Sequence, residues 1–208
     1  MRGLPNRTRL ATGNLIYRGV PSEYTEATLV DYTDIKKRIF FERYLNNLDD
    51  MYEDKMHLIL YGNNGTGKTY LSSILIKEAY RQRYDSCIVT LAQLMELTFN
   101  SSRSEEVSNK LNYINKCHFL VIDEVGKENF TSSLSNITLL ENTLRKAVTN
   151  GQVVIICTNL SMDKLGESYG ASVASLISGF TKVKFEAPDQ RQAVRQGKRA
   201  SRILRGEI

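Results

Sequence analysis

One stretch of the chain combines the residue types needed to hold a phosphate chain, namely Gly62-Asn63-Asn64-Gly65-Thr66-Gly67-Lys68-Thr69. Its spacing fits the pattern G-x-x-x-x-G-K-[ST]. The glycines allow a tight turn, so that successive backbone N–H groups point into one concavity, and the positive end of a following helix favours an anion there. The Lys68 ammonium can reach the β- and γ-phosphates of a nucleotide, and the Thr69 hydroxyl can ligate Mg²⁺. We therefore predict that these residues, together with Tyr70 at the start of the helix, bind a nucleotide.

Two adjacent acids follow an apolar run further along the chain, in the order Phe119-Leu120-Val121-Ile122-Asp123-Glu124. An acid at the carboxyl end of a parallel strand faces the ligand crevice. We predict that Asp123 holds Mg²⁺ through water and that Glu124 polarises the attacking water as a general base. Acid pairs also occur at ordinary strand exits, and the phosphate loop upstream is what favours the Walker B interpretation.

A third polar position follows the next apolar run, which reads Val153-Val154-Ile155-Ile156-Cys157-Thr158-Asn159. A polar side chain at this strand end would lie beside the phosphate loop, between the γ-phosphate and the lytic water. The alternative is an asparagine that only starts a turn, where this residue type is common. The order of the three motifs favours a sensing role for Asn159.

The elements that must position these residues alternate along the chain. Apolar runs predict strands at 57–61, 86–90, 118–122, 153–157 and 182–185. Helical spacing of apolar residues predicts helices at 34–47, 70–81, 91–97, 105–115 and 136–149, with two short ones at 162–168 and 172–177. We expect the first twenty residues and 127–135 to be irregular, and 20–29 to be an extended segment that runs into a short helix. The alternation predicts a three-layer α/β/α fold with a mostly parallel five-stranded sheet.

The composition limits the class of protein. A chain of 208 residues with 41% apolar and 25% charged residues suits one globular domain. No apolar run approaches the ~20 residues of a membrane span, and the basic N-terminus lacks the apolar core of a signal peptide. We therefore expect a cytoplasmic protein without a membrane partner. The cysteines are far apart in sequence and lie in or beside predicted strands, so we expect buried, reduced thiols at Cys87, Cys117 and Cys157.

The net charge of +5 is concentrated at the two ends of the chain. Residues 191–208 hold six basic side chains and one acid, and residues 1–20 hold four basic side chains and no acid. Basic ends favour a polyanionic partner such as nucleic acid, the alternative being two solvated termini. If 189–202 is helical, one face carries the candidate DNA contacts Arg191, Arg195, Arg199 and Arg202. Arg191 could instead reach the nucleotide.

With these motifs in this order, the chain resembles the AAA+ ATPases of the DnaC/DnaI/IstB group, which includes helicase loaders of bacteria and phages and an ATPase accessory of transposition. The resemblance covers about residues 20–191. It is carried by Leu60-Tyr61-Gly62 through Thr69 as the Walker A motif and by Phe119 to Glu124 as the Walker B motif. It is also carried by Ile156-Cys157-Thr158-Asn159-Leu160 as the sensor 1 strand, and by Val20-Pro21-x-x-Tyr24-x-x-Ala27-Thr28-Leu29. This last segment looks like the one that leads to the adenine pocket of the family.

The resemblance implies a function as well as a fold. It implies an AAA+ ATPase domain at 20–188 with little or no C-terminal lid, between a basic arm at 1–19 and a basic helix or tail at 189–208. It implies ATP and Mg²⁺ as cofactors and a role in DNA replication, with a replicative helicase and single-stranded DNA as partners. The alternatives are a transposition accessory and a nucleotide-dependent interaction module with little turnover. A small-molecule kinase ranks last, because the sequence has no Arg-rich lid over the phosphates.

Two departures from the family pattern bear on activity. The family has an arginine that reaches a neighbour's ATP where this chain has Leu176, and often a basic residue where it has Ser172. Such an arginine can contribute roughly 10³–10⁵ in rate, so its absence leads us to expect weak ATP hydrolysis. A homo-oligomer is possible, but the missing arginine argues against the usual ATP-bridged one. Arg145 is an alternative source of charge or an ordinary surface residue. About twenty residues precede the family segment, too few for the loaders' separate helicase-binding domain, so we expect that contact to be a short peptide or to lie elsewhere.

Overall fold

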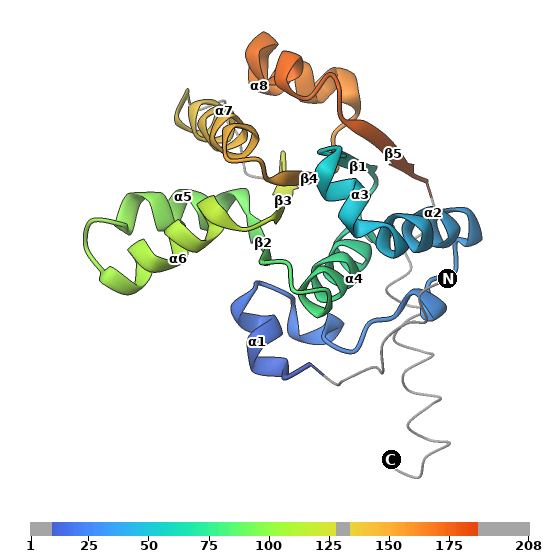
Figure 1. Cartoon of the computed structure of the whole chain (residues 1–208). Coiled ribbons are helices and arrows are strands. Elements are labelled where there is room, and N and C mark those ends of the chain that lie inside the picture. The colour runs from blue at the N-terminus through green and yellow to red at the C-terminus, as the bar shows by residue number, and fades with distance from the viewer. Residues whose placement is uncertain (1–9, 128–133, 187–208) are drawn as a thin grey trace.

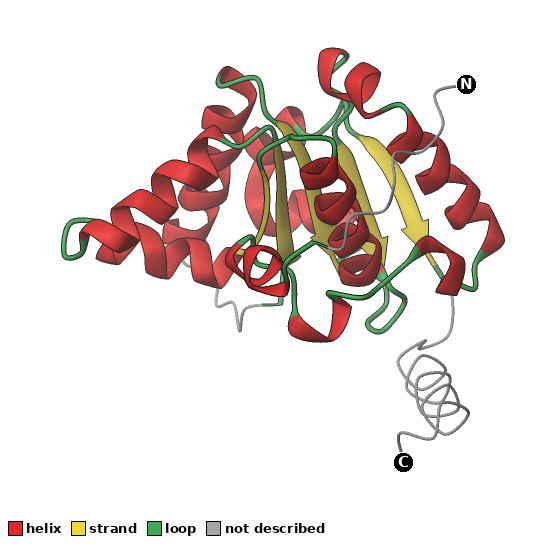
Figure 2. Ribbon diagram, turned by 60° about the horizontal axis from the view of Figure 1, so that its bottom comes forward, coloured by secondary structure: helices red, strands yellow, loops and turns green. Residues whose placement is uncertain are grey.

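The computed structural model describes residues 10–127 and 134–186. Five parallel strands form one sheet in the order β2-β3-β4-β1-β5. The strands are β1 (Leu58–Gly62), β2 (Ser86–Thr90), β3 (Phe119–Val125), β4 (Val153–Thr158) and β5 (Thr181–Phe185). Figure 2 shows this sheet between helices on both of its faces. The predicted three-layer α/β/α fold is confirmed; the predicted lack of a C-terminal lid concerns residues outside the described ones.

Alternate residues of the strands pack into two separate cores, because successive side chains of a strand point to opposite faces. Leu58, Leu60 and Val121 face one helical layer, made of α1 (Thr12–Tyr17), α2 (Ile35–Asn46), α3 (Leu48–Glu53) and α4 (Lys68–Arg81). Ile59, Leu120 and Ile122 face the other, made of α5 (Leu91–Asn100), α6 (Glu105–Lys116), α7 (Leu134–Thr149) and α8 (Met162–Leu176). Figure 1 shows the two layers on either side of the strands.

Helix α4 follows the phosphate loop directly and is buried along most of its length. Its apolar residues Leu71 and Leu75 are fully buried against the sheet. Its buried polar residues are paired, since the Lys77 ammonium donates a 2.7 Å hydrogen bond to the Ala27 carbonyl and Ser72 Oγ lies 3.1 Å from Cys157 Sγ. This packing fixes the helix N-terminus, and with it the first helical residues Lys68 and Thr69, at the loop.

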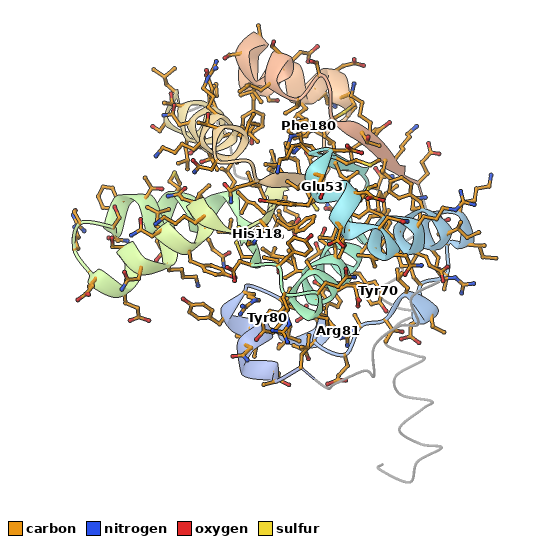
Figure 3. The ribbon with its side chains drawn as sticks, viewed as in Figure 1. Glu53, Tyr70, Tyr80, Arg81, His118 and Phe180 are labelled. Atoms are coloured by element: carbon orange, nitrogen blue, oxygen red, sulfur yellow. The ribbon has the colours of Figure 1, made fainter. Side chains whose placement is uncertain are left out.

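The expectation that the first twenty residues are irregular is wrong for α1. Leu15 is only 2% exposed in the core, and the Ile88 N–H donates a 2.8 Å hydrogen bond to the Arg18 carbonyl, which covers the open edge of β2. The Arg18 guanidinium lies 3.7 Å from the ring centre of Tyr80, which sits beside α1 (Figure 3). A helix this short is stabilised by tertiary contacts rather than by its own propensity, so its sequence carries a weak signal.

Other boundaries differ from expectation in smaller ways. The chain turns at Asn47 and continues as α3, where the sequence predicts only the exit of the preceding helix. Helix α8 is interrupted at Gly170 (φ 81°, ψ 170°), which matches the two short helices predicted there. The segment predicted at 20–29 holds one short 3₁₀ turn, Ser22–Tyr24, and a second, Leu29–Asp31, begins at its end. Of the loop expected at 127–135, residues 128–133 lie outside the described part and α7 already begins at Leu134.

The three cysteines are buried, as expected, but two of them meet in space. Cys87 and Cys117 are 3% and 1% exposed, and their Sγ atoms lie 3.5 Å apart. The contact with Cys117 and burial raise the pKa of the Cys87 thiol well above its ordinary value. The Cys87 thiol is therefore neutral at physiological pH, and both cysteines serve as apolar packing residues.

Candidate nucleotide-binding site

A cavity of about 450 Å³ opens at the carboxyl ends of the central strands. Ten of the residues predicted to bind nucleotide or to act on it line this cavity: Asn64, Gly65, Thr66, Gly67, Lys68, Thr69, Tyr70, Asp123, Glu124 and Asn159. The two other predicted loop residues, Gly62 and Asn63, contribute backbone carbonyls beneath Lys68. The structure thus brings together three motifs that are separated by tens of residues in sequence.

The Lys68 side chain is folded into the phosphate loop. Its ammonium donates hydrogen bonds of 2.7 Å to the carbonyls of Gly62 and Asn63, and the residue is only 7% exposed. A buried ammonium needs such partners, because leaving its donors unsatisfied would be costly. Phosphate oxygens are stronger acceptors than carbonyls for a charged donor, so an incoming nucleotide could take over these bonds.

Gly67 is a position at which only glycine fits. It precedes α4 with φ at 96°, a left-handed conformation that other residues adopt at a cost. A Cβ atom there would come within 2.6 Å of Tyr32 Cε2. The Tyr32 hydroxyl also donates a 3.0 Å hydrogen bond to the Thr66 carbonyl, so this ring closes the loop from outside.

A direct hydrogen bond joins the two Walker motifs. The Thr69 hydroxyl donates to Asp123 Oδ2 at 2.8 Å, and the Glu124 N–H donates to Asp123 Oδ1 at 2.7 Å. Burial raises the pKa of the Asp123 carboxyl, which is 5% exposed. Hydroxyl and carboxylate oxygens facing one cavity are ligands that suit Mg²⁺, which is usually held by one or two protein groups with waters and phosphates.

A bulge in β3 directs this acid pair into the cavity. Ile122 lies opposite Ile156 and Val125 opposite Thr158, so two residues of β3 oppose a single residue of β4. Such bulges bend a strand and re-aim its side chains. Glu124 itself has φ at 60°, a rare conformation for a residue with a side chain.

A tight turn follows the acid pair and is anchored at several points. The Lys127 N–H donates to the Glu124 carbonyl at 3.0 Å, and Gly126 has φ at 85°. The Gly126 N–H donates a 3.0 Å hydrogen bond to the hydroxyl of Tyr169, which is 2% exposed. At the head of this turn the Lys127 ammonium forms an ion pair with Glu124 Oε1.

Asn159 lies at the end of β4, where the sequence placed it, and it lines the cavity with Lys68 and Glu124. The preceding residue fixes this strand end, since the Thr158 hydroxyl donates to the Val125 carbonyl at 2.7 Å. The position fits a residue that senses the γ-phosphate, a role that stays a prediction.

An aromatic wall forms the side of the cavity nearest the N-terminal segment. The Tyr70 ring stacks on Tyr32, with ring centres 5.9 Å apart, and meets the edge of Tyr24 at 5.5 Å. The Tyr70 hydroxyl donates to the Thr28 carbonyl at 2.9 Å, and burial raises its pKa to about 12. These rings offer flat, apolar surface of the kind that a nucleobase packs on.

The cavity-lining residues that sequence reasoning missed include Tyr32 and Lys127. Tyr32 has no local signal, because it reaches the loop only through the path of the N-terminal segment. Lys127 had a weak one, since a glycine two residues after an acid pair indicates a turn that could bring the next side chain back.

Other residues singled out from the sequence lie away from the cavity or beyond the described residues. Arg145 donates a 2.9 Å hydrogen bond to Ser172 Oγ and pairs with Glu141, so it joins α7 to α8 and is not among the cavity-lining residues. Leu176 packs, partly buried, on the core beneath α8. Arg191, Arg195, Arg199 and Arg202 lie outside the described residues.

Within residues 10–127 and 134–186, none of the helices is long and apolar enough to cross a membrane. Nor does any group of three or more His, Cys, Asp and Glu side chains in those ranges form a metal-binding cluster. A Mg²⁺ ion at Thr69 and Asp123 would therefore depend on phosphate oxygens and water for its remaining ligands.

Comparison with known protein families identifies the family of this chain. The model of the family described as IstB-like ATP-binding proteins matches residues 24–177. The chain belongs to this family. The match includes all the motifs that line the cavity, so this IstB-like protein shares the nucleotide-binding domain of an ATP-binding family.

Relatives in sequence agree with that assignment. The chain is 25% identical over 139 residues to the replicative helicase loader DnaI of Bacillus subtilis (strain 168), covering 65% of this chain and 44% of DnaI. It is 28% identical over 128 residues to a protein described as an IS21-like insertion-sequence ATP-binding protein of Bacteroides fragilis (strain YCH46), covering 60% of this chain and 63% of that one. The chain thus spans less than two thirds of either relative.

The fold is that of known AAA+ replication proteins. The crystal structure of the DnaC helicase loader aligns with a TM-score of 0.69 at 19% identity, covering 80% of this chain and all of that one. The crystal structure of DnaI aligns at 0.62 and 22% identity, covering 84% and 99%. AMPPCP-bound DnaA from Aquifex aeolicus aligns at 0.63 and 18% identity, covering 83% and 54%. At these identities the likeness establishes the fold alone.

Proposed function

We propose that this IstB-like protein is a Mg-ATP-dependent switch with slow ATP hydrolysis, and that it acts in DNA replication as a helicase-loader-like protein. The observation that carries the nucleotide part is the hydrogen bond from Thr69 to Asp123 at the rim of a cavity that also holds Lys68 and Glu124. A pre-formed pair of oxygen ligands beside a phosphate loop is the arrangement that Mg-ATP needs.

In this proposal the chain's own groups divide the work. Backbone N–H groups of the loop hold the phosphates, and Lys68 exchanges its two carbonyl partners for the β- and γ-phosphates. Thr69 and Asp123 hold Mg²⁺, which when bound neutralises charge that develops on the phosphate oxygens. Glu124 polarises the attacking water, and Asn159 senses the γ-phosphate.

The loader-like role rests on the relatives and on the charge of the chain. DnaI is named a replicative helicase loader, and the chain is related to it over 139 residues. In this proposal the basic segments at 1–19 and 189–208 bind the phosphates of single-stranded DNA. The ATPase domain proposed at 20–188 contacts the helicase. The proposal places the protein in the cytoplasm.

A transposition accessory is the second candidate, because one relative is described as IS21-like and the family model is that of IstB-like proteins. A third is an interaction module with little turnover, favoured by an apolar Leu176 where the family resemblance implies an arginine.

One set of assays separates these candidates. ATP hydrolysis and nucleotide binding are measured alone, with single-stranded DNA, with a replicative hexameric helicase, and with a transposase on its end DNA. Faster ATP hydrolysis in the presence of the helicase, or ATP-dependent binding of the protein to the helicase, supports the loader-like role. ATP-dependent binding to the transposase complex supports the transposition accessory. ATP binding without hydrolysis in every mixture leaves the interaction module.

A further inference from the structure

Lys127 is a cation of the cavity that has no role in the proposed function. Among the described residues that line the cavity, the cations are Lys68 and Lys127, and the acids are Glu23, Asp31, Asp123 and Glu124. Lys68 belongs to the phosphate loop and is buried, whereas Lys127 is 38% exposed and pairs with Glu124, which is 44% exposed. The second cation of the site is thus bound to the group proposed to polarise the attacking water.

The backbone beneath this ion pair is fixed, whereas the pair itself can exchange. Hydrogen bonds from Gly126 to the Tyr169 hydroxyl and from the Lys127 N–H to the Glu124 carbonyl hold the turn, and a Cβ atom on Gly126 would meet Leu160 Cδ1 at 2.6 Å. A lysine has a flexible four-carbon stem, so its ammonium can change partner without moving the backbone.

We propose that Lys127 is a γ-phosphate-binding residue that holds the Glu124 carboxylate in the absence of nucleotide and exchanges it for the γ-phosphate of ATP. This inference rests on the proposed binding of ATP in the cavity. A terminal phosphate carries more negative charge than one carboxylate and offers three acceptor oxygens, so it competes successfully for the ammonium. The exchange would free Glu124 for water at the moment when ATP, and not ADP, is bound.

The exchange gives the γ-phosphate a second cation from the same subunit, beside Lys68. The family resemblance implies an arginine from a neighbour for that task, and this chain has Leu176 at the position. Arg145 does not replace it, since its guanidinium is bound to Glu141 and Ser172 between α7 and α8. Lys127 lies in the cavity itself, three residues after Glu124.

The test compares the affinities of AMPPCP and ADP, with Mg²⁺, for the full chain and its variants. Loss of a charge-assisted contact to the γ-phosphate predicts that K127M weakens AMPPCP binding roughly 10- to 100-fold and leaves ADP binding unchanged. K127R retains the charge and keeps most of the preference for AMPPCP. The matched control is R81M, which removes the same charge and another i,i+3 ion pair, Arg81–Glu78, at the far end of α4.

A second pair of variants tests the exchange itself. E124Q releases Lys127 from its carboxylate, so it should bind AMPPCP more tightly than the wild type does, and E124Q/K127M should lose that gain. Equal weakening of both nucleotides by K127M, no weakening of either, or no gain in E124Q would each overturn the inference while ATP binding by the wild type stands. Absence of AMPPCP and ADP binding by the wild type would instead refute the proposed function, and the inference with it.

Discussion

The Thr69 hydroxyl donates a 2.8 Å hydrogen bond to Asp123 Oδ2, and so joins the first turn of α4 to the end of β3. The two residues are 54 positions apart in sequence. Both side chains face the cavity that the phosphate loop lines. Because each is an oxygen ligand of the kind Mg²⁺ prefers, their contact indicates where a metal bound with ATP would lie.

Replacement of Asp123 by asparagine should separate metal binding from folding. D123N removes a buried charge but keeps an oxygen acceptor, so its free energy of unfolding at pH 8 should equal or exceed that of the wild type. It should lose the Mg²⁺-dependent part of ATP affinity. Chemical denaturation and nucleotide titration with and without Mg²⁺ measure the two effects, and retained Mg²⁺ dependence would show that Asp123 is not a ligand.

The same variant tests the pKa of Asp123. Because burial raises that pKa in the folded state, the folded protein takes up a proton at a higher pH than the unfolded chain does. The free energy of unfolding of the wild type should therefore rise relative to that of D123N as the pH falls from neutral toward the ordinary carboxyl pKa of about 4. A difference between the two proteins that stays constant over this range would contradict the shift.

Gly67 should not tolerate even the smallest side chain. G67A combines a left-handed backbone with a Cβ atom 2.6 Å from Tyr32, so it should cost about 1–3 kcal/mol of stability and abolish nucleotide binding. Gly13 is the matched control, since a Cβ there meets nothing within 4 Å and the residue lies in α1. Thermal unfolding measures the stability of the two variants, and nucleotide titration measures their binding. A G67A protein as stable as G13A would refute the close approach of Tyr32.

The Tyr169 hydroxyl should stabilise the turn that follows Glu124. Y169F leaves the Gly126 N–H without its 3.0 Å acceptor, which should cost roughly 1–3 kcal/mol of stability and loosen the turn that carries Glu124. We expect slower ATP hydrolysis with little change in ADP affinity. Hydrogen exchange at Gly126 checks the mechanism, because unchanged protection there would mean that the hydroxyl is not its partner.

The strands and the phosphate loop could be predicted from sequence because their signals are local. Runs such as Phe119 to Ile122 are apolar for burial on both faces, and the loop has fixed spacing. Helix α1 and Tyr32 could not be predicted, because their conformations depend on distant partners, Ile88 for the first and Thr66 for the second. The contact between Cys87 and Cys117 likewise depends on how β2 pairs with β3.

The basic tail gives a prediction about DNA. If Arg191, Arg195, Arg199 and Arg202 follow a phosphate backbone, a 1–188 truncation should bind single-stranded DNA more weakly, and the salt slope of the affinity should fall by about 3. The truncation keeps every strand and helix described above, so its nucleotide affinity should not change. Binding that keeps its full salt dependence without the tail would place the DNA contact elsewhere.

Calorimetric titration of the full chain with ATP and Mg²⁺, beside a K68A variant, tests the central claim most directly. Lys68 makes two hydrogen bonds to loop carbonyls that the phosphates would replace. We predict one ATP bound per chain by the wild type, and an affinity at least ~10-fold lower in K68A, as expected for the loss of charge-assisted hydrogen bonds. No binding by the wild type, or equal binding by both proteins, would contradict the assignment of this cavity as a nucleotide site.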